Sequence, residues 1–174
     1  MVRIQELTKK KTLAAEKMNR TAWRGLAIFL FTAFGVAAVG AMVTASSLGQ
    51  WYFSLTKPIW TPPESFFGPI WTALYLSMAV AAWRVWMKRD QFEIKPAMVF
   101  YHLQLAANLL WSVFFFGLHN PALALGDIVA LQFFNIATAA TFFRIDRIAG
   151  LLLLPYLVWV SFATVLNFYI WVTN

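Results

Sequence analysis

The residues of this chain best suited to chemistry are amide and indole side chains that recur at helical spacing within apolar segments. In one segment such residues are separated by four, three and four positions: Gln104, Asn108, Trp111 and Phe115. This spacing places them along one side of a helix. An amide in lipid is costly unless it is paired, so the stripe should face other protein. Amides hydrogen bond and indoles stack, so the expected chemistry is recognition of a flat, mostly apolar ligand.

Two other apolar segments repeat this theme. One carries Tyr156, Trp159, Ala163 and Asn167, and the other carries Trp71, Tyr75 and Met78. The small Ala163 would leave room beside Trp159. For any single amide the alternative is a hydrogen bond that only joins two helices. Three stripes that mix rings and amides favour a shared pocket.

Other kinds of site have little support in the sequence. The chain has no Cys and only two His residues, His102 and His119, so we expect no metal site and no cofactor. No Ser-His-Asp set or phosphate-binding loop is evident. Asp127 fits an acid that complements a helix N-terminus, with a proton site as the alternative. Arg84 lies where its side chain can snorkel to the membrane interface.

The composition identifies the solvent of these segments as a lipid bilayer. Hydrophobic residues make up 61% of the 174 residues and charged residues 12%, whereas soluble domains have about 45–50% and about 25%. Five apolar segments are long enough to cross a membrane as helices. Their approximate ranges are 25–48, 67–87, 97–118, 121–143 and 148–172. The predicted fold class is therefore an all-α membrane protein with a five-transmembrane-helix bundle.

The distribution of positive charge predicts the orientation of this bundle. Lys and Arg number 14, and all except Lys57 fall in residues 1–24, in the second and fourth connections between spans, or, for Arg84, near the end of the second span beside its connection. The positive-inside rule then places the N-terminus in the cytoplasm. We divide the chain into a basic cytoplasmic tail, residues 1–24, and a transmembrane domain, residues 25–174. The net charge of +7 fits contact with anionic lipid better than with nucleic acid.

Two further segments carry unusual patterns. Small residues recur every four positions in the first span, at Ala33, Ala37, Ala41 and Ala45, which permits close helix packing, either within the chain or in a homodimer. The first connection contains WYFSLTKPIWTPP at 51–63. Its prolines restrict the backbone, and its rings could stack on a ligand. We expect a cap over the pocket, with Lys57 available for a ligand carboxylate; the alternative is a loop that only packs at the interface.

Four motifs follow one another along the five spans. They are WY-x2-L-x-KP-x-W-x-PP at 51–63, GPIWTALY at 68–75, Q-L-x2-N-x2-W-x3-FF at 104–116 and PYLVWVSFATVLN at 155–167. With these motifs the chain resembles the translocator protein family, also called tryptophan-rich sensory proteins or peripheral-type benzodiazepine receptors. The resemblance covers about residues 30–172.

The resemblance implies a five-helix bundle that often forms a homodimer, with a ligand cavity beneath the first loop. It implies binding of porphyrins and other tetrapyrroles, of sterols and of benzodiazepine-type ligands, in transport, sensing or regulation. The implied pocket wall consists of Tyr52, Trp71, Asn108, Trp111, Trp159 and Ala163.

The resemblance also implies an enzymatic alternative, and the chain departs from the family pattern at one motif. Some bacterial members are thought to degrade porphyrin in light, and the residues linked to that activity match Tyr52 and Trp159. Animal members carry a sterol motif in which Tyr is followed by Lys or Arg. Neither Tyr156 nor Tyr169 is followed by such a residue, which argues against cholesterol as the natural ligand.

Overall fold

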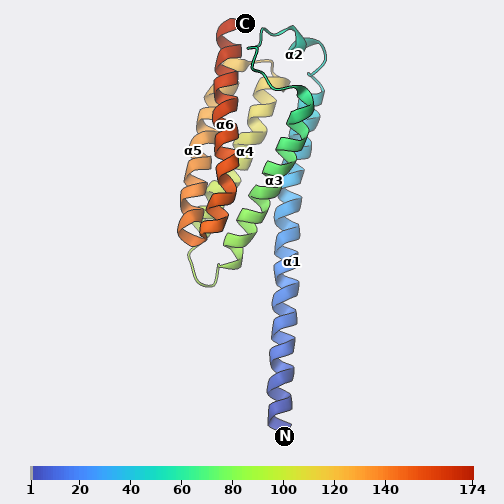
Figure 1. The fold of residues 1–174 in the computed structure, drawn as a ribbon, viewed down its shortest axis with the longest axis vertical. Coiled ribbons are helices and arrows are strands. Elements are labelled where there is room, and N and C mark those ends of the chain that lie inside the picture. Colours follow the sequence, from blue (N-terminus) through green and yellow to red (C-terminus); the bar gives the residue numbers. More distant parts are fainter. Residues whose placement is uncertain (1) are drawn as a thin grey trace.

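The computed structural model describes the backbone of residues 2–174 and the side chains of residues 18–49 and 51–174. Every element in this part of the chain is helical (Figure 1). In order they are α1 (Val2–Ala45), α2 (Gln50–Ser54), α3 (Glu64–Met87), α4 (Lys95–Ser112), the π-helical turn η1 (Val113–Gly117), α5 (Pro121–Ile145) and α6 (Arg147–Thr173).

Five of these helices are long and apolar enough to cross a membrane. The spans are Met18–Ala45, Glu64–Met87, Lys95–Gly117, Pro121–Ile145 and Arg147–Thr173. The predicted fold class is therefore confirmed, and the chain is a multi-pass integral membrane protein. Four predicted spans agree closely with these limits, whereas the first begins earlier because α1 is a single helix that runs through residues 24 and 25. The predicted tail, residues 1–24, lies mainly where side chains are not described.

The helices form one bundle from which the N-terminal half of α1 projects (Figure 1). Helix α5 packs against α4 and α6, and α3 packs against α1 and α6. The largest fully buried side chains include Tyr101, Phe142 and Tyr156. Helix α2 and the C-terminus lie at one end of the bundle, opposite the N-terminus.

Side-chain caps mark where α5 and α6 begin. The side chain of Asn120 accepts a hydrogen bond from the Leu123 N–H at 2.9 Å, and Pro121 occupies the first turn of α5. Both features are favourable there, because Asn satisfies a free N–H and Pro lacks one. The side chain of Asp146 caps α6 in the same way through the Ala149 N–H at 3.0 Å.

Asp146 also joins three helices at the end of the bundle away from α2. Its carboxylate lies 3.0 Å from the Arg84 guanidinium and 3.2 Å from the Lys88 ammonium. Arg84 is therefore ion-paired, where the sequence suggested a side chain that only snorkels. Burial alone would raise the pKa of Asp146, but the Ala149 N–H and the two cations outweigh it and lower the pKa to about 2.

We expect Asp146→Asn to lower the free energy of unfolding by about 2 kcal/mol at pH 7. Asn caps a helix as well as Asp does, so the variant isolates the charge. The lowered pKa stabilises the wild type above pH 4 and ceases to do so as the pH falls toward 2. Unfolding in mixed micelles should therefore show a difference between the two proteins that shrinks over this range. Asp90→Asn, an exposed acid in the α3–α4 connection, is the control; a difference that does not change with pH would contradict the assignment.

Candidate functional site

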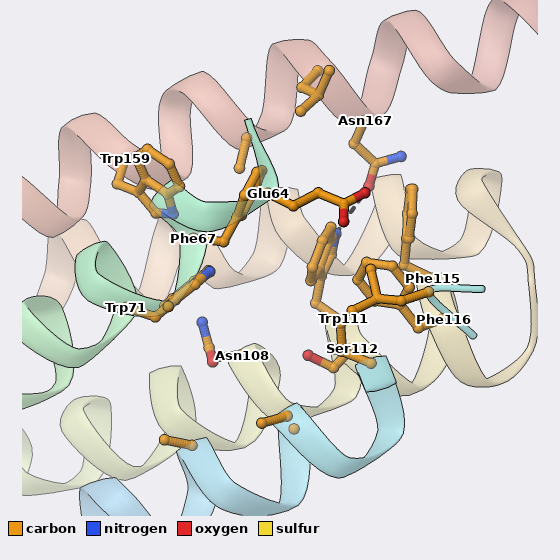
Figure 2. A pocket seen from close by; sticks show the side chains of 18 of the residues that line it. Glu64, Phe67, Trp71, Asn108, Trp111, Ser112, Phe115, Phe116, Trp159 and Asn167 are labelled. Atoms are coloured by element: carbon orange, nitrogen blue, oxygen red, sulfur yellow. Dashed lines mark hydrogen bonds between the residues drawn. The ribbon is translucent and has the colours of Figure 1, made fainter. Parts of the chain in front are cut away.

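A cavity of about 430 Å³ lies between α1, α3, α4 and α6, beneath α2 (Figure 2). None of its lining residues comes from α5. Its wall consists of Phe34, Ala37, Gly40, Ala41, Thr44, Leu48, Tyr52, Glu64, Phe67, Gly68, Trp71, Thr72, Tyr75, Asn108, Trp111, Ser112, Phe115, Phe116, Trp159, Phe162, Ala163, Leu166, Asn167 and Ile170. Apolar and aromatic side chains dominate this wall, as in sites for small organic ligands.

Three indoles from three helices form the aromatic part of the wall. The rings of Trp71 and Trp159 meet edge to face, with centroids 6.3 Å apart and planes at 87°. Trp111 stacks on Phe115, with centroids 5.1 Å apart and planes at 20°. Because the flat faces point in different directions, the wall can contact a planar ligand from more than one side.

The amides of the wall are held by hydrogen bonds to neighbouring helices. Tyr75 donates its hydroxyl proton to Asn108 Oδ1, and Asn108 Nδ2 donates to the Tyr156 hydroxyl at 2.9 Å. Trp111 Nε1 donates to Asn167 Oδ1 at 2.9 Å, and Asn167 Nδ2 donates to the backbone oxygen of Pro121 at 2.8 Å. These amides therefore join helices and line the cavity at the same time, so the two interpretations of the stripes do not compete.

Trp159 differs from the other polar groups of the wall. Its Nε1–H is buried and has no hydrogen-bond partner among the described residues. A buried donor without a partner costs free energy. The Trp159 residue lines the cavity, but neighbouring protein atoms cover this nitrogen, so it does not face the open space.

The π-helical turn η1 shapes the end of the cavity near α2. The Leu118 N–H donates to the Val113 oxygen at 2.8 Å, five residues back, which inserts one extra residue into this turn. As a result Phe115 and Phe116 are both buried and both line the cavity. Tyr52 of α2 packs against both rings. Burial, and secondly the charge of Glu64, raise the pKa of the Tyr52 hydroxyl.

The segment between α1 and α3 is attached to the bundle at several points. Trp51 stacks on His119, with centroids 4.3 Å apart, and Ser47 donates to the Phe116 oxygen at 2.6 Å. On the other side, the Thr56 N–H donates to Asn174 Oδ1 at 2.8 Å. The segment contributes Leu48 and Tyr52 to one end of the cavity wall, and its function as a cap over a ligand stays a prediction.

Lys57 does not lie in the cavity wall. Its ammonium donates to the Tyr52 backbone oxygen at 2.7 Å and sits 4.0 Å from the centroid of the Tyr52 ring. The wall residues described by the structure do not include it. In this arrangement Lys57 holds the turn of the cap and is not placed to meet a carboxylate inside.

The cavity brings together all six residues predicted for the pocket: Tyr52, Trp71, Asn108, Trp111, Trp159 and Ala163. That these residues bind a ligand stays a prediction. Other members of the stripes, Gln104, Met78 and Tyr156, are fully buried in the bundle core and do not line the cavity. In α1, Ala33 is fully buried and Ala37 and Ala41 line the cavity, whereas Ala45 is exposed and does not line it. The homodimer alternative for this small-residue face stays a prediction.

Sequence reasoning missed several residues of the wall. Glu64 and Phe67 follow the prolines of the cap and precede the Trp71 stripe. Their positions at i−7 and i−4 from Trp71 would have placed them on the same helix face. Phe116 carried no such signal, because regular helical spacing from Trp111 selects only Phe115.

Comparisons with known proteins agree with this architecture. The profile of the TspO/MBR family matches residues 27–172. The tryptophan-rich sensory protein of Cereibacter sphaeroides is 42% identical over 142 residues, which cover 80% of this chain and 87% of that protein. The tryptophan-rich protein TspO of Chlorobaculum tepidum is 40% identical over 147 residues, which cover 82% of this chain and 91% of that protein.

A mammalian protein shows the same similarity. The translocator protein of Homo sapiens is 35% identical over 127 residues, which cover 72% of this chain and 75% of that protein. The matched region includes all four motifs and nearly the whole of the five spans. The chain therefore belongs to the TspO/MBR family.

Proposed function

We propose that this protein binds tetrapyrroles, porphyrins in particular, in the cavity beneath α2 and takes part in their transport, sensing or regulation. The observation that carries the proposal is a cavity of about 430 Å³ walled by Trp71, Trp111 and Trp159. This volume falls within the range of about 300–1,000 Å³ typical of ligand sites. Indole faces favour a planar aromatic macrocycle, and the wall offers only a few polar groups to orient it.

The proposal predicts that Trp71→Ala and Trp159→Ala each weaken protoporphyrin binding about tenfold, because truncating a buried aromatic contact usually costs more than 1 kcal/mol. Affinity should be measured from the porphyrin absorbance bands, which do not depend on the number of tryptophans in the protein. Trp23→Ala is the matched control, since Trp23 is 65% exposed and lies outside the cavity wall. Equal affinities in all three variants would refute this assignment of the site.

The enzymatic alternative, light-dependent porphyrin degradation, has one feature in its favour. The oxidisable rings of Tyr52 and Trp159 both line the cavity. Illumination of the complex distinguishes the two functions. A new absorbing product that is lost in Tyr52→Phe and Trp159→Phe would support catalysis, whereas bleaching at the rate of free porphyrin would leave binding alone.

The same cavity is our proposed site for sterols and benzodiazepine-type ligands, which should then compete with porphyrin. We further propose that the N-terminus is cytoplasmic, as the positions of all Lys and Arg residues except Lys57 indicate. Contact with anionic lipid through residues 1–24 and assembly into a homodimer complete the proposal.

A further inference from the structure

Glu64 gives the cavity wall a negative charge. Among the wall residues that the structure describes, it is the only one with an ionisable acid or base of Lys, Arg, Asp, Glu or His type. It stands in the first turn of α3, directly after the prolines of the cap. Figure 2 shows its carboxylate extending from α3 toward Asn167 on α6, above the ring of Trp111.

The neighbouring donors are engaged elsewhere. Trp111 Nε1 donates to Asn167 Oδ1, and Asn167 Nδ2 donates to the Pro121 oxygen. Lys57, the basic residue of the cap, donates to the Tyr52 oxygen and lies against the Tyr52 ring. No hydrogen bond or ion pair joins Glu64 to any other side chain in the described part of the chain. Glu64 is exposed at the edge of the cavity, and its carboxylate, which is an acceptor only, is open to a donor from water or from a ligand.

The charge of Glu64 acts on the interior of the site. It is the second cause, after burial, of the raised pKa of Tyr52, which lines the same cavity. Water screens part of the charge of this exposed side chain, but the cavity beside it is mostly apolar, so the acid still affects a charged group of a ligand bound next to it. A ligand carboxylate at this end would be repelled, and an ammonium or N–H donor would be attracted.

We propose that Glu64 determines specificity: the site prefers flat aromatic ligands that present a cationic or N–H-donating group to the α2 end of the cavity. This inference rests on the proposed function and narrows its ligand class. A porphyrin with free carboxylates would bind with those groups turned away from Glu64.

Three porphyrins that share one macrocycle and differ in the charge of its two side arms test the proposal. They are protoporphyrin with its two carboxylates, its neutral dimethyl ester, and a bis-amide with two terminal amines. Each is titrated into wild type, Glu64→Gln and Asp90→Asn in a non-ionic detergent at pH 7.5. Gln keeps the shape of Glu and removes its charge, while Asp90→Asn removes one negative charge from the α3–α4 connection, outside the cavity wall.

We expect Glu64→Gln to weaken binding of the amine-bearing porphyrin about fivefold and to tighten binding of the dicarboxylate about threefold, the size typical of an exposed ion pair. The dimethyl ester should bind wild type and Glu64→Gln with equal affinity. Asp90→Asn should bind all three ligands with the affinities of wild type. An unchanged ratio of amine to dicarboxylate affinity in Glu64→Gln would overturn the inference while leaving porphyrin binding intact. Failure of all three ligands to bind wild type would overturn the proposed function itself.

Discussion

Ala163→Phe is expected to reduce porphyrin affinity about 100-fold, equivalent to about 2.8 kcal/mol. Ala163 lines the cavity on α6, one turn beyond Trp159. A phenyl ring at this position would occupy space that the ligand needs, and a steric block discriminates more strongly than the loss of one contact. The absorbance titration used for the tryptophan variants measures the effect.

The control for this variant is Val165→Phe, two residues further along the same helix. Val165 is 57% exposed and lies outside the cavity wall, so its replacement adds a ring on the outer surface. Val165→Phe should bind porphyrin as wild type does. Because the ring at position 163 enters empty space, the midpoint of thermal unfolding should not fall. Similar affinities for the two variants would mean that the ligand binds somewhere else.

Asn108→Leu is expected to lower the free energy of unfolding by about 3 kcal/mol. Each of the two hydroxyl groups left without its partner contributes about 1.5 kcal/mol of this loss. Asn108 accepts from Tyr75 and donates to Tyr156, and the three residues are each no more than 5% exposed. Leu has nearly the same shape but offers neither contact. Unfolding in mixed micelles measures the loss.

Removing the two hydroxyls distinguishes unpaired polar groups from poor packing. In the Asn108→Leu background, Tyr75→Phe and Tyr156→Phe leave no orphaned hydroxyl at this site. Replacing all partners of a buried hydrogen bond by apolar groups can be nearly neutral. The triple variant should therefore regain most of the lost stability. If it were less stable than Asn108→Leu alone, the network would not be the cause.

Much of the fold could be predicted because membrane spans are encoded locally. Length and hydropathy locate the five helices. Helix α1 begins before the predicted first span at residue 25, because helical backbone can continue through charged and polar residues outside the bilayer.

The pocket could be predicted only in part, because helical spacing shows which residues share a face and does not show their depth. Trp71, Asn108 and Trp159 line the cavity, but Gln104 and Tyr156 from the same stripes are buried below it. Helices that cross at an angle lie close together at one level of the bundle and farther apart at another. The level at which they separate depends on the whole bundle.

Two other features required the assembled structure. The extra residue in η1 turns Phe116 inward, which regular helical periodicity does not predict. Glu64 has the usual position of an acid in the first turn of a helix, where it complements the positive end of the helix dipole. Its spacing of seven residues from Trp71 indicates a shared helix face, but the packing of α3 beside α6 is needed to show that this face borders the cavity.

The central claim is that a planar ligand occupies this cavity, and thiol protection tests it most directly. The natural chain has no Cys, so Ser112→Cys introduces a single thiol into the wall with little change in shape. Ser65→Cys places the same thiol on an exposed position of α3 outside the wall. Both are labelled with a small water-soluble thiol reagent, with and without saturating protoporphyrin.

We predict that protoporphyrin slows labelling of the Ser112→Cys variant about tenfold or more, because a bound macrocycle excludes the reagent from the cavity. Labelling of the Ser65→Cys variant should stay unchanged. Equal labelling rates for the Ser112→Cys variant with and without bound protoporphyrin would contradict the account, since the ligand would then leave the cavity open.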